Sequence, residues 1–387
     1  MRSLTWSEVH QRRLERNYLL ESAPPEQMIH VVGAVRGLQA QVLTAAELGI
    51  SARVVGVTQQ QVREQLWKRR HLVKTYSLRG TVHLHPADEL PLWTAARRGL
   101  HDWREGRWHE TYNMDQAQAR TVLDALTDAL DGRGLTREEL ADAVARCVGS
   151  WARERIASTW ADLIGLGFDA GLLCFGPNRG NKVTFVRADQ WLSNRQEIDP
   201  TEALADIFRH YLATYGPATP QDFARWFMPQ HLKPAEAREL ADSLANELEE
   251  VEVEGERAWL LAADADTGWQ PLGTSLRLLP QYDCYIIGSR FGRERIVPES
   301  ARARVFAHKN GRFEGAVGLP LLLIDGVVAG MWERRKRGSR TEIRVEPFIH
   351  LTAHQSQQLE AEALRSGEFL GTEIVLLQGA LAGPGKD

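Results

Sequence analysis

Two glutamines flank one small residue in the stretch Gln39-Ala40-Gln41, and their amide groups could act together on one ligand. Apolar residues recur at helical spacing on both sides of this stretch, which predicts a helix–helix junction there. Side chains two positions apart do not share a helical face, but they point the same way where the backbone is extended. An extended junction would therefore direct both amides toward one ligand, whereas a turn would leave two surface glutamines.

Three other polar residues, Arg79, Thr81 and His83, occupy alternate positions of a predicted strand that follows another strand at 72–78. Alternate residues of a strand face one side of a sheet, so these three could line a DNA-binding cleft. The alternative is an ordinary half-buried strand. Asp283 lies among aromatic residues and could be a site carboxylate, although we favour a role in satisfying buried backbone amides.

A cationic segment lies between two predicted strands at 327–332 and 341–345. A cationic tip on a short β-ribbon can enter a DNA groove or follow the phosphates. A solvated loop is the alternative interpretation. The candidate DNA-binding residues of this segment are Arg334, Arg335, Lys336, Arg337 and Arg340.

No motif for a nucleotide, a metal or a cofactor accompanies these residues. The sequence contains no Walker A pattern, no zinc-ligand spacing and no Gly-x-Ser-x-Gly motif, so the corresponding hydrolase and deaminase chemistries are not supported. Cys147, Cys174 and Cys284 lie far apart and fit reduced thiols. We therefore expect no cofactor and no metal.

Charge is segregated along the 387 residues, although the net value is only -4. Basic residues concentrate in 61–80 and 331–345, while 236–256 is strongly acidic. A polyanion responds to the local surface rather than to the net charge, so nucleic acid remains a possible partner. The sequence has no apolar run of membrane-spanning length and no signal-peptide core, which predicts a cytoplasmic protein without a membrane partner.

The elements that must position these residues follow a repeated order. Capping boxes at Thr5, Thr58 and Thr352 predict helices near 6–20, 59–70 and 353–365. From residue 114, three predicted helices precede a hairpin at 172–186, and the same order returns between 201 and 261. Helix, helix, helix and hairpin is the order of a winged helix. The first 110 residues could be a more diverged copy.

Winged helices often bind DNA, but many only mediate protein contacts. The third helix of the last copy is acidic, so it is poorly suited to bind in a DNA groove. The repeats therefore resemble a structural scaffold more than a set of separate DNA-binding units. Beyond residue 269 the pattern becomes strand-rich. One predicted strand lies at 315–319, and a tight turn is predicted at Asp325-Gly326. We therefore predict an α+β fold with three tandem winged-helix units and a β-rich C-terminal unit, divided at 1–112, 113–195, 196–268 and 269–387.

Four stretches in the same order resemble the winged-helix DNA glycosylases related to the azinomycin-resistance enzyme AlkZ and to YcaQ. The matching pieces are Leu38-Gln39-Ala40-Gln41, Arg79-Gly80-Thr81-Val82-His83-Leu84, Leu279-Pro280-Gln281-Tyr282-Asp283 and Asp325-Gly326-Val327-Val328-Ala329-Gly330-Met331-Trp332. The catalytic motif of that family is glutamine, any residue, then glutamine or aspartate. Gln39 and Gln41 match the glutamine form, which belongs to the AlkZ-like branch.

The resemblance implies tandem winged helices that form a C-shaped channel for double-stranded DNA carrying alkylated purines. It also implies hydrolysis of the N-glycosidic bond of those purines, including crosslinked ones, by a nucleoid-associated enzyme that we expect to be a monomer. A glutamine cannot be a general base, but it can orient water beside a purine that alkylation at N7 has already activated. No lysine lies in the candidate site motifs, so base release without strand nicking is expected. The alternative is a non-catalytic winged-helix DNA-binding protein or transcriptional regulator on the same scaffold.

Overall fold

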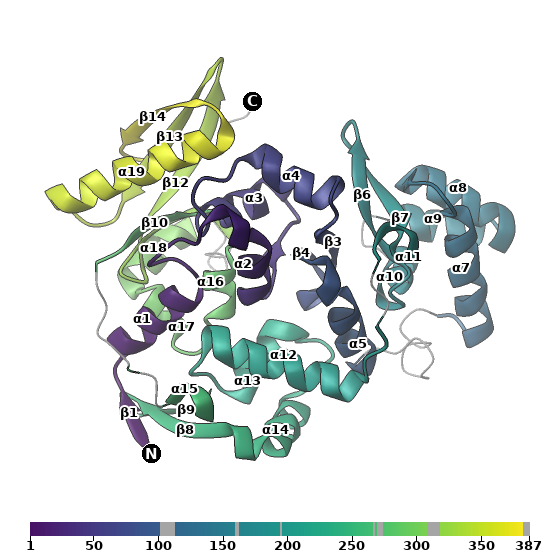
Figure 1. Cartoon of the computed structure of the whole chain (residues 1–387), viewed down its shortest axis with the longest axis horizontal. Coiled ribbons are helices and arrows are strands. Elements are labelled where there is room, and N and C mark those ends of the chain that lie inside the picture. The colour runs from purple at the N-terminus through teal and green to yellow at the C-terminus, as the bar shows by residue number, and fades with distance from the viewer. Residues whose placement is uncertain are drawn as a thin grey trace. The chain divides into compact units, whose positions relative to one another are not determined.

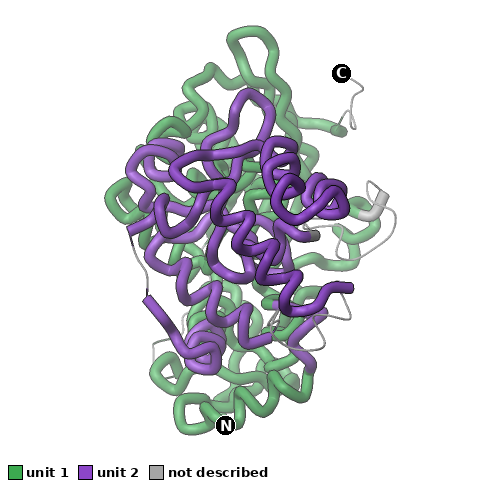
Figure 2. Tube along the Cα trace, turned by 90° about the vertical axis from the view of Figure 1, so that its right-hand side faces the viewer, with its two compact units in different colours: residues 1–62, 209–227, 234–387 green, residues 63–208, 228–233 purple. Residues whose placement is uncertain are grey.

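The computed structural model describes residues 1–100, 113–158, 162–193, 196–265, 268, 274–307 and 318–381. The chain is a mixed α/β protein (Figure 1), which confirms the predicted α+β class at this level. It divides into two compact units (Figure 2). Unit 1 comprises residues 1–62, 209–227 and 234–387, and unit 2 comprises residues 63–208 and 228–233. The four predicted domain boundaries remain a prediction.

Unit 1 carries both glutamines and the basic hairpin. Its helices are α1 (Trp6–Arg16), α2 (Met28–Ala34), α3 (Leu43–Ser51), α13 (Pro220–Phe227), α14 (Pro234–Ser243), α15 (Ala262–Ala265), α16 (Cys284–Gly288), α17 (Arg293–Ile296), α18 (Glu299–Ala307) and α19 (Ala353–Leu370). Its strands are β1 (Arg2–Leu4), β2 (Leu38–Gln39), β8 (Leu248–Val253), β9 (Glu256–Leu261), β10 (Leu276–Leu279), β11 (Leu321–Ile324), β12 (Val327–Arg337), β13 (Arg340–Pro347) and β14 (Glu373–Gln378). Two more helices, α4 (Gln59–Trp67) and α12 (Pro200–Tyr215), cross the unit boundaries in sequence.

A five-stranded sheet in the order β10-β11-β12-β13-β14 is the largest sheet of unit 1. Its strands are antiparallel except for β14, which runs parallel to β13. The predicted tight turn is confirmed, because Asp325 and Gly326 both have positive φ and Ile324 pairs with Val327. One face of the sheet buries Met331 with apolar residues of α1 and α16, and the other buries Trp332 with apolar residues of α19.

Helix starts follow the predicted capping boxes. Thr5 and Glu8 exchange hydrogen bonds at the start of α1, and Thr352 caps α19. Helix α1 ends at Arg16, earlier than predicted, because Asn17 donates to the Arg13 carbonyl (2.8 Å) and Tyr18 adopts a positive φ. The predicted strand at 315–319 lies mostly outside the described residues.

Unit 2 contains residues 114–186, for which the sequence predicted most clearly the order of three helices followed by a hairpin. Its helices are α5 (Leu90–Leu100), α7 (Gln116–Ala129), α8 (Arg137–Val148), α9 (Trp151–Ala157), α10 (Asp162–Asp169) and α11 (Ala188–Trp191), and its strands are β3 (Leu72–Tyr76), β4 (Val82–Pro86), β5 (Leu135–Thr136), β6 (Leu173–Arg179) and β7 (Lys182–Arg187). Strands β6 and β7 form the predicted antiparallel hairpin, and β5 completes a sheet in the order β5-β7-β6. Where one helix was expected at 151–166, the structure has α9 and α10.

The buried His10 gives unit 1 a predictable sensitivity to acid. Burial, together with the nearby Arg13 and Arg295, lowers the pKa of His10 from 6.5 to about 4. A histidine with a lowered folded-state pKa binds fewer protons when folded, so its contribution to stability is present above pH 6.5 and is lost as pH falls. At pH 5 we expect the loss to be about 2 kcal/mol, since one pKa unit corresponds to about 1.4 kcal/mol.

Urea unfolding of the wild type and of His10→Phe at pH 7 and pH 5 measures this contribution. The variant is expected to lose less stability between the two values than the wild type, and replacement of the exposed His354 serves as the control. Equal losses in the wild type and His10→Phe would show that His10 does not set the acid sensitivity.

Candidate active site

The glutamine stretch lies between α2 and α3, and its first half is extended, because Leu38 and Gln39 form β2 while Gln41 lies in a bend. Leu38 and Ala40 are buried, with exposures of 2% and 0%, whereas Gln39 is half-buried and Gln41 is exposed. This alternation of burial is the one expected if the two glutamines lie on one side of the segment. The shared direction of the two amides remains a prediction.

Side chains from α12 fix the point at which the chain leaves α2. The Thr214 hydroxyl donates to the Ala34 carbonyl (2.8 Å), and the Tyr215 hydroxyl donates to the Val35 carbonyl (2.7 Å). The last carbonyls of a helix have no intrahelical partner, so these bonds satisfy groups that would otherwise be unpaired. The positive φ of Gly37 then turns the chain into β2.

A buried ion pair between Arg53 and Asp283 supports the glutamine segment. Arg53 donates through Nη1 and Nη2 to the two carboxylate oxygens of Asp283 (2.8 and 2.7 Å), and both side chains are fully buried. Arg53 Nη1 also donates to the Gly49 carbonyl in α3 (2.9 Å). A Cβ atom added at Gly49 would lie 2.9 Å from Leu38 Cδ2. Helix α3 and strand β2 are therefore in close contact beside the ion pair.

Asp283 is therefore a structural residue here, in line with the favoured interpretation of the sequence. Its carboxylate accepts a hydrogen bond from the Tyr285 amide (2.9 Å) at the start of α16 as well as both bonds from Arg53. Burial alone would lower the pKa of Arg53, but the adjacent Asp283 carboxylate outweighs this effect and raises the pKa above its usual value. The guanidinium consequently stays charged.

The predicted strand that carries Arg79, Thr81 and His83 is only partly correct. Arg79 lies in a single 3₁₀ turn with a φ of 55°, and β4 begins after Thr81. The Thr81 hydroxyl donates to the Leu78 carbonyl (3.0 Å), and His83 is 2% exposed. The three side chains therefore do not form one exposed row. The predicted alternation of these side chains along one strand was wrong because the chain reverses its direction between β3 and β4, and this reversal requires a turn at Arg79-Gly80.

His83 and Arg79 are nevertheless brought together. Arg79 Nη2 lies 3.3 Å from His83 Nε2, and His83 Nδ1 lies 3.0 Å from the Thr81 carbonyl oxygen. Burial, with a further contribution from the Arg79 charge, lowers the pKa of His83 well below its usual value. His83 is therefore a neutral group that orients Arg79. A role of these residues in DNA binding remains a prediction.

The basic hairpin is longer and more regular than predicted. Strands β12 and β13 continue to Arg337 and Arg340, which pair with each other, so the turn contains only Gly338 and Ser339. The predicted strand ends at 332 and 341 were therefore wrong, because Gly338 adopts a positive φ and permits a tight turn. The cationic side chains consequently project in a fixed order from the two faces of a ribbon.

Ion pairs divide these cations into two groups. Arg335 contacts Glu333 (3.5 Å) and Arg340 contacts Glu373 (2.9 Å). The side chains of Lys336 and Arg337 are exposed and make no hydrogen bond or ion pair with the residues that the structure describes. These two groups are therefore available to an anionic partner.

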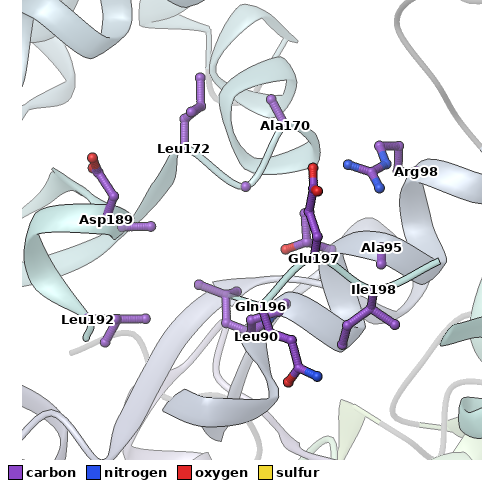
Figure 3. Close-up of a pocket in the computed structure, with 14 residues that line it drawn as sticks. Leu90, Ala95, Arg98, Ala170, Leu172, Asp189, Leu192, Gln196, Glu197 and Ile198 are labelled. Carbon is purple, nitrogen blue, oxygen red and sulfur yellow. The ribbon is translucent and has the colours of Figure 1, made fainter. Parts of the chain in front are cut away.

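Unit 2 contains a cavity of about 330 Å³ (Figure 3). Apolar side chains such as Leu172 and Leu192 line it, together with the polar side chains of Arg98 and Glu197. None of the predicted catalytic or DNA-binding residues lines this cavity. Within the described part of the chain, no cluster of three or more His, Cys, Asp or Glu could hold a metal ion, and no helix is long and apolar enough to span a bilayer.

The sequence analysis missed the residues that support the glutamines: Arg53, Thr214 and Tyr215. They carry no local signal, since their partners lie 230, 180 and 180 residues away. It also missed Glu47, a fully buried carboxylate in α3 that accepts a hydrogen bond from the Gln59 amide (2.6 Å). An isolated acidic residue in an apolar helix was the one signal that could have drawn attention to it.

These features occur in a chain that belongs to the AlkZ-like DNA glycosylase family. The family, described as "DNA glycosylase AlkZ-like", matches residues 32–369, which include both glutamines and the basic hairpin. The chain is 31% identical over 367 residues to an interstrand DNA cross-link repair glycosylase of Streptomyces sahachiroi, covering 93% of this chain and 95% of that protein. The solved structure of Streptomyces sahachiroi DNA glycosylase AlkZ is similar, with a TM-score of 0.83, 28% identity, and coverage of 97% of this chain and 100% of the other.

Proposed function

We propose that this protein is a monofunctional DNA glycosylase that hydrolyses the N-glycosidic bond of N7-alkylated purines in double-stranded DNA, including bulky adducts and interstrand crosslinks. The observation that carries the proposal is the pair formed by Gln39 and Gln41, both more exposed than Leu38 and Ala40, in a chain of the AlkZ-like family. The name of the S. sahachiroi relative, a cross-link repair glycosylase, supports the class of lesion.

The chemistry suits two neutral amides. A purine alkylated at N7 is cationic and leaves the sugar readily, so the enzyme mainly has to place a water molecule and stabilise an oxocarbenium-like transition state. Each glutamine can accept a hydrogen bond from that water through its carbonyl oxygen and donate one through its amide nitrogen. Since neither residue can act as a general base, undamaged purines, which are poorer leaving groups, are spared.

The exposure of Gln41 bears on the size of the substrate. A crosslink ties the lesion to both strands, so extruding a whole nucleotide into a closed pocket is difficult. A catalytic amide at an exposed position can reach a lesion that stays close to the duplex. The motif stretches 38–41 and 79–84 contain no lysine that could form a Schiff base, which favours hydrolysis without a lyase step.

The repeated segments then act as a scaffold. We infer that the elements from α7 to β7, and those from α12 to β9, are winged helices. Their third helices are poor DNA readers, because Arg153 is paired with Asp142 (2.7 Å), Arg155 lies over the Trp151 ring, and α14 is acidic. The basic hairpin is therefore the main contact that we propose for the DNA phosphates.

A duplex with a single N7-methylguanine tests the proposal against a non-catalytic DNA-binding role. Incubation with the protein should create an abasic site, so the labelled strand should break only after heating in alkali. Strand breakage before alkali would show a lyase step and overturn the monofunctional assignment. Tight binding of the duplex with no alkali-labile product at saturating protein would instead identify a binding protein or regulator.

Removing the exposed cations of the hairpin should weaken binding without regard to sequence. Each phosphate contact contributes about 0.9 to the slope of log affinity against log salt. Replacing Arg334, Lys336 and Arg337, which are all exposed, together with alanine is therefore expected to flatten that slope by about one unit per genuine contact. Fluorescence anisotropy with two unrelated duplexes at several salt concentrations measures both effects.

Stability should change little, because exposed ion pairs contribute at most about 1 kcal/mol. A triple variant of Arg238, Arg257 and Lys233, which are exposed residues outside the hairpin, controls for the change in net charge. An unchanged salt slope in the hairpin variant would show that the hairpin does not contact DNA.

A further inference from the structure

The two faces of the basic hairpin carry different patterns of charge. Side chains alternate between the faces of a strand, so the register of β12 against β13 assigns each charged residue to one face. Trp332, Arg334 and Lys336 share the face whose apolar residues pack against α19, which we call the first face. The central part of the opposite face, the second face, carries Glu333, Arg335, Glu342 and Arg344.

The charges at the centre of the second face compensate one another through ion pairs. Glu333 lies opposite Arg344 in the ladder, and the next pair on this face joins Arg335 to Glu342. Arg335 contacts Glu333 (3.5 Å), while Arg344 contacts Glu342 (3.1 Å) and lies 3.9 Å from Glu333. The four side chains are only 19–29% exposed. Because opposite charges on neighbouring strands stabilise each other, both arginines already have anionic partners.

The first face carries cations but no acidic residue of β12, β13 or β14. Arg334 lies opposite Ile343, Lys336 lies opposite Thr341, and β14 places only neutral residues on this side. The side chains of Arg334 and Lys336 are exposed and form no hydrogen bond or ion pair within the described part of the chain. Arg337 lies at the turn, where the ribbon ends, and does not distinguish the two faces.

We propose that the hairpin binds DNA by its first face, where Arg334 and Lys336 contact neighbouring phosphates of one strand, and that the second face is turned away from the duplex. The inference rests on the proposed function and specifies which surface of the hairpin holds the substrate. Two residues of a strand span about 6.8 Å, which suits neighbouring phosphates of a nucleic-acid strand. Contacts of this kind position a protein on DNA without reading its sequence.

The carboxylates make the second face a poor surface for phosphates. A phosphate that approached this face would meet Glu333 and Glu342 as well as the two arginines, and like charges repel. An arginine of this face that turned toward DNA would leave its carboxylate partner half-buried and uncompensated, which is costly. A phosphate that binds Arg334 and Lys336 breaks no ion pair of the hairpin, and the release of counterions from the DNA favours its binding.

Two matched double variants test the assignment by fluorescence anisotropy with an undamaged duplex at several salt concentrations. The variant Arg334→Gln/Lys336→Gln removes two positive charges from the first face, and Arg335→Gln/Arg344→Gln removes two from the second. We expect the slope of log affinity against log salt to flatten by about 1.8 in the first variant, since each phosphate contact contributes about 0.9. The slope of the second variant should equal that of the wild type. Equal flattening in both variants, flattening in the second alone, or flattening in neither would overturn the proposal.

The variant Glu333→Gln/Glu342→Gln tests the same point in the opposite direction. It frees Arg335 and Arg344 from their carboxylate partners without removing any cation from the hairpin. If the second face is turned away from the duplex, the salt slope should stay at the wild-type value. A steeper slope with tighter binding would show that phosphates reach the second face and would refute the proposal. This variant decides the question if Arg335→Gln/Arg344→Gln does not fold.

These measurements separate the inference from the proposed function, because binding of undamaged DNA needs no catalysis. Base excision by the wild type, together with an unchanged salt slope in Arg334→Gln/Lys336→Gln, would refute the assignment of the face and leave the glycosylase activity intact. A flattened slope in that variant of a protein that releases no base would support the assignment of the face and refute the glycosylase activity.

Discussion

Replacing either Gln39 or Gln41 with alanine is expected to reduce base excision by about 100-fold or more, in the range measured when one preorganised hydrogen-bond donor is removed from a transition state. Leu38 and Ala40 are the residues of this segment that anchor it in the core, so the backbone should keep its position without either amide. The Kd for damaged duplex should remain close to the wild-type value. Single-turnover excision and anisotropy titration, with the same duplex, measure the two quantities.

The Gln59→Ala variant controls for the replacement of a glutamine by alanine outside the proposed catalytic pair. Gln59 is also a glutamine of unit 1, but its amide bonds to Glu47 rather than facing the proposed substrate. If Gln39→Ala and Gln41→Ala lost affinity and activity in parallel, the two residues would be binding contacts and not catalytic ones. A Gln41→Asp variant would show whether the aspartate of the YcaQ-like motif works in this site.

Replacing Asp283 with alanine is expected to lower the free energy of unfolding by about 3–5 kcal/mol, because it leaves the buried Arg53 charge without a partner. The pair is fully buried, and the same carboxylate caps α16. Urea unfolding at pH 7 measures the change. The variant should also lose excision activity, since this ion pair holds α3, and α3 packs against β2 of the glutamine segment.

The exposed pair of Arg340 and Glu373 offers the matched control for Asp283. Its two side chains are 59% and 62% exposed, so Glu373→Ala should change the stability by at most about 1 kcal/mol. Similar effects of Glu373→Ala and Asp283→Ala would show that the buried pair has no special role. In that case the support for the glutamine segment would have to come from α12.

Local chemistry made much of the fold predictable. Capping boxes at Thr5 and Thr352 fixed the starts of two helices, and the Asp325-Gly326 turn fixed the register of β11 against β12. The place of the glutamine segment between two helices was also predictable, because apolar residues recur at helical spacing on both sides of it.

Other parts of the site depend on contacts that no local pattern encodes. Arg53 meets Asp283 across 230 residues, and Tyr215 meets the end of α2 across 180. The strand expected at Arg79 failed because alternation of side chains does not reveal a turn, although Gly80 was a signal for one. The strands of the hairpin were predicted too short because a run of arginines resembles a solvated segment, whereas Gly338 permits strand pairing up to the tip.

The release of free base from a defined substrate is the most direct measurement of the central claim. A duplex with one N7-methylguanine, a duplex with a bulky N7 adduct and one with an N7-linked interstrand crosslink are each incubated with the protein, and the products are separated by chromatography and identified by mass. The account predicts that free alkylated purine appears from each substrate at a rate that falls with Gln39→Ala, while undamaged duplex releases none. Bound but intact substrates, or release that Gln39→Ala does not slow, would contradict it.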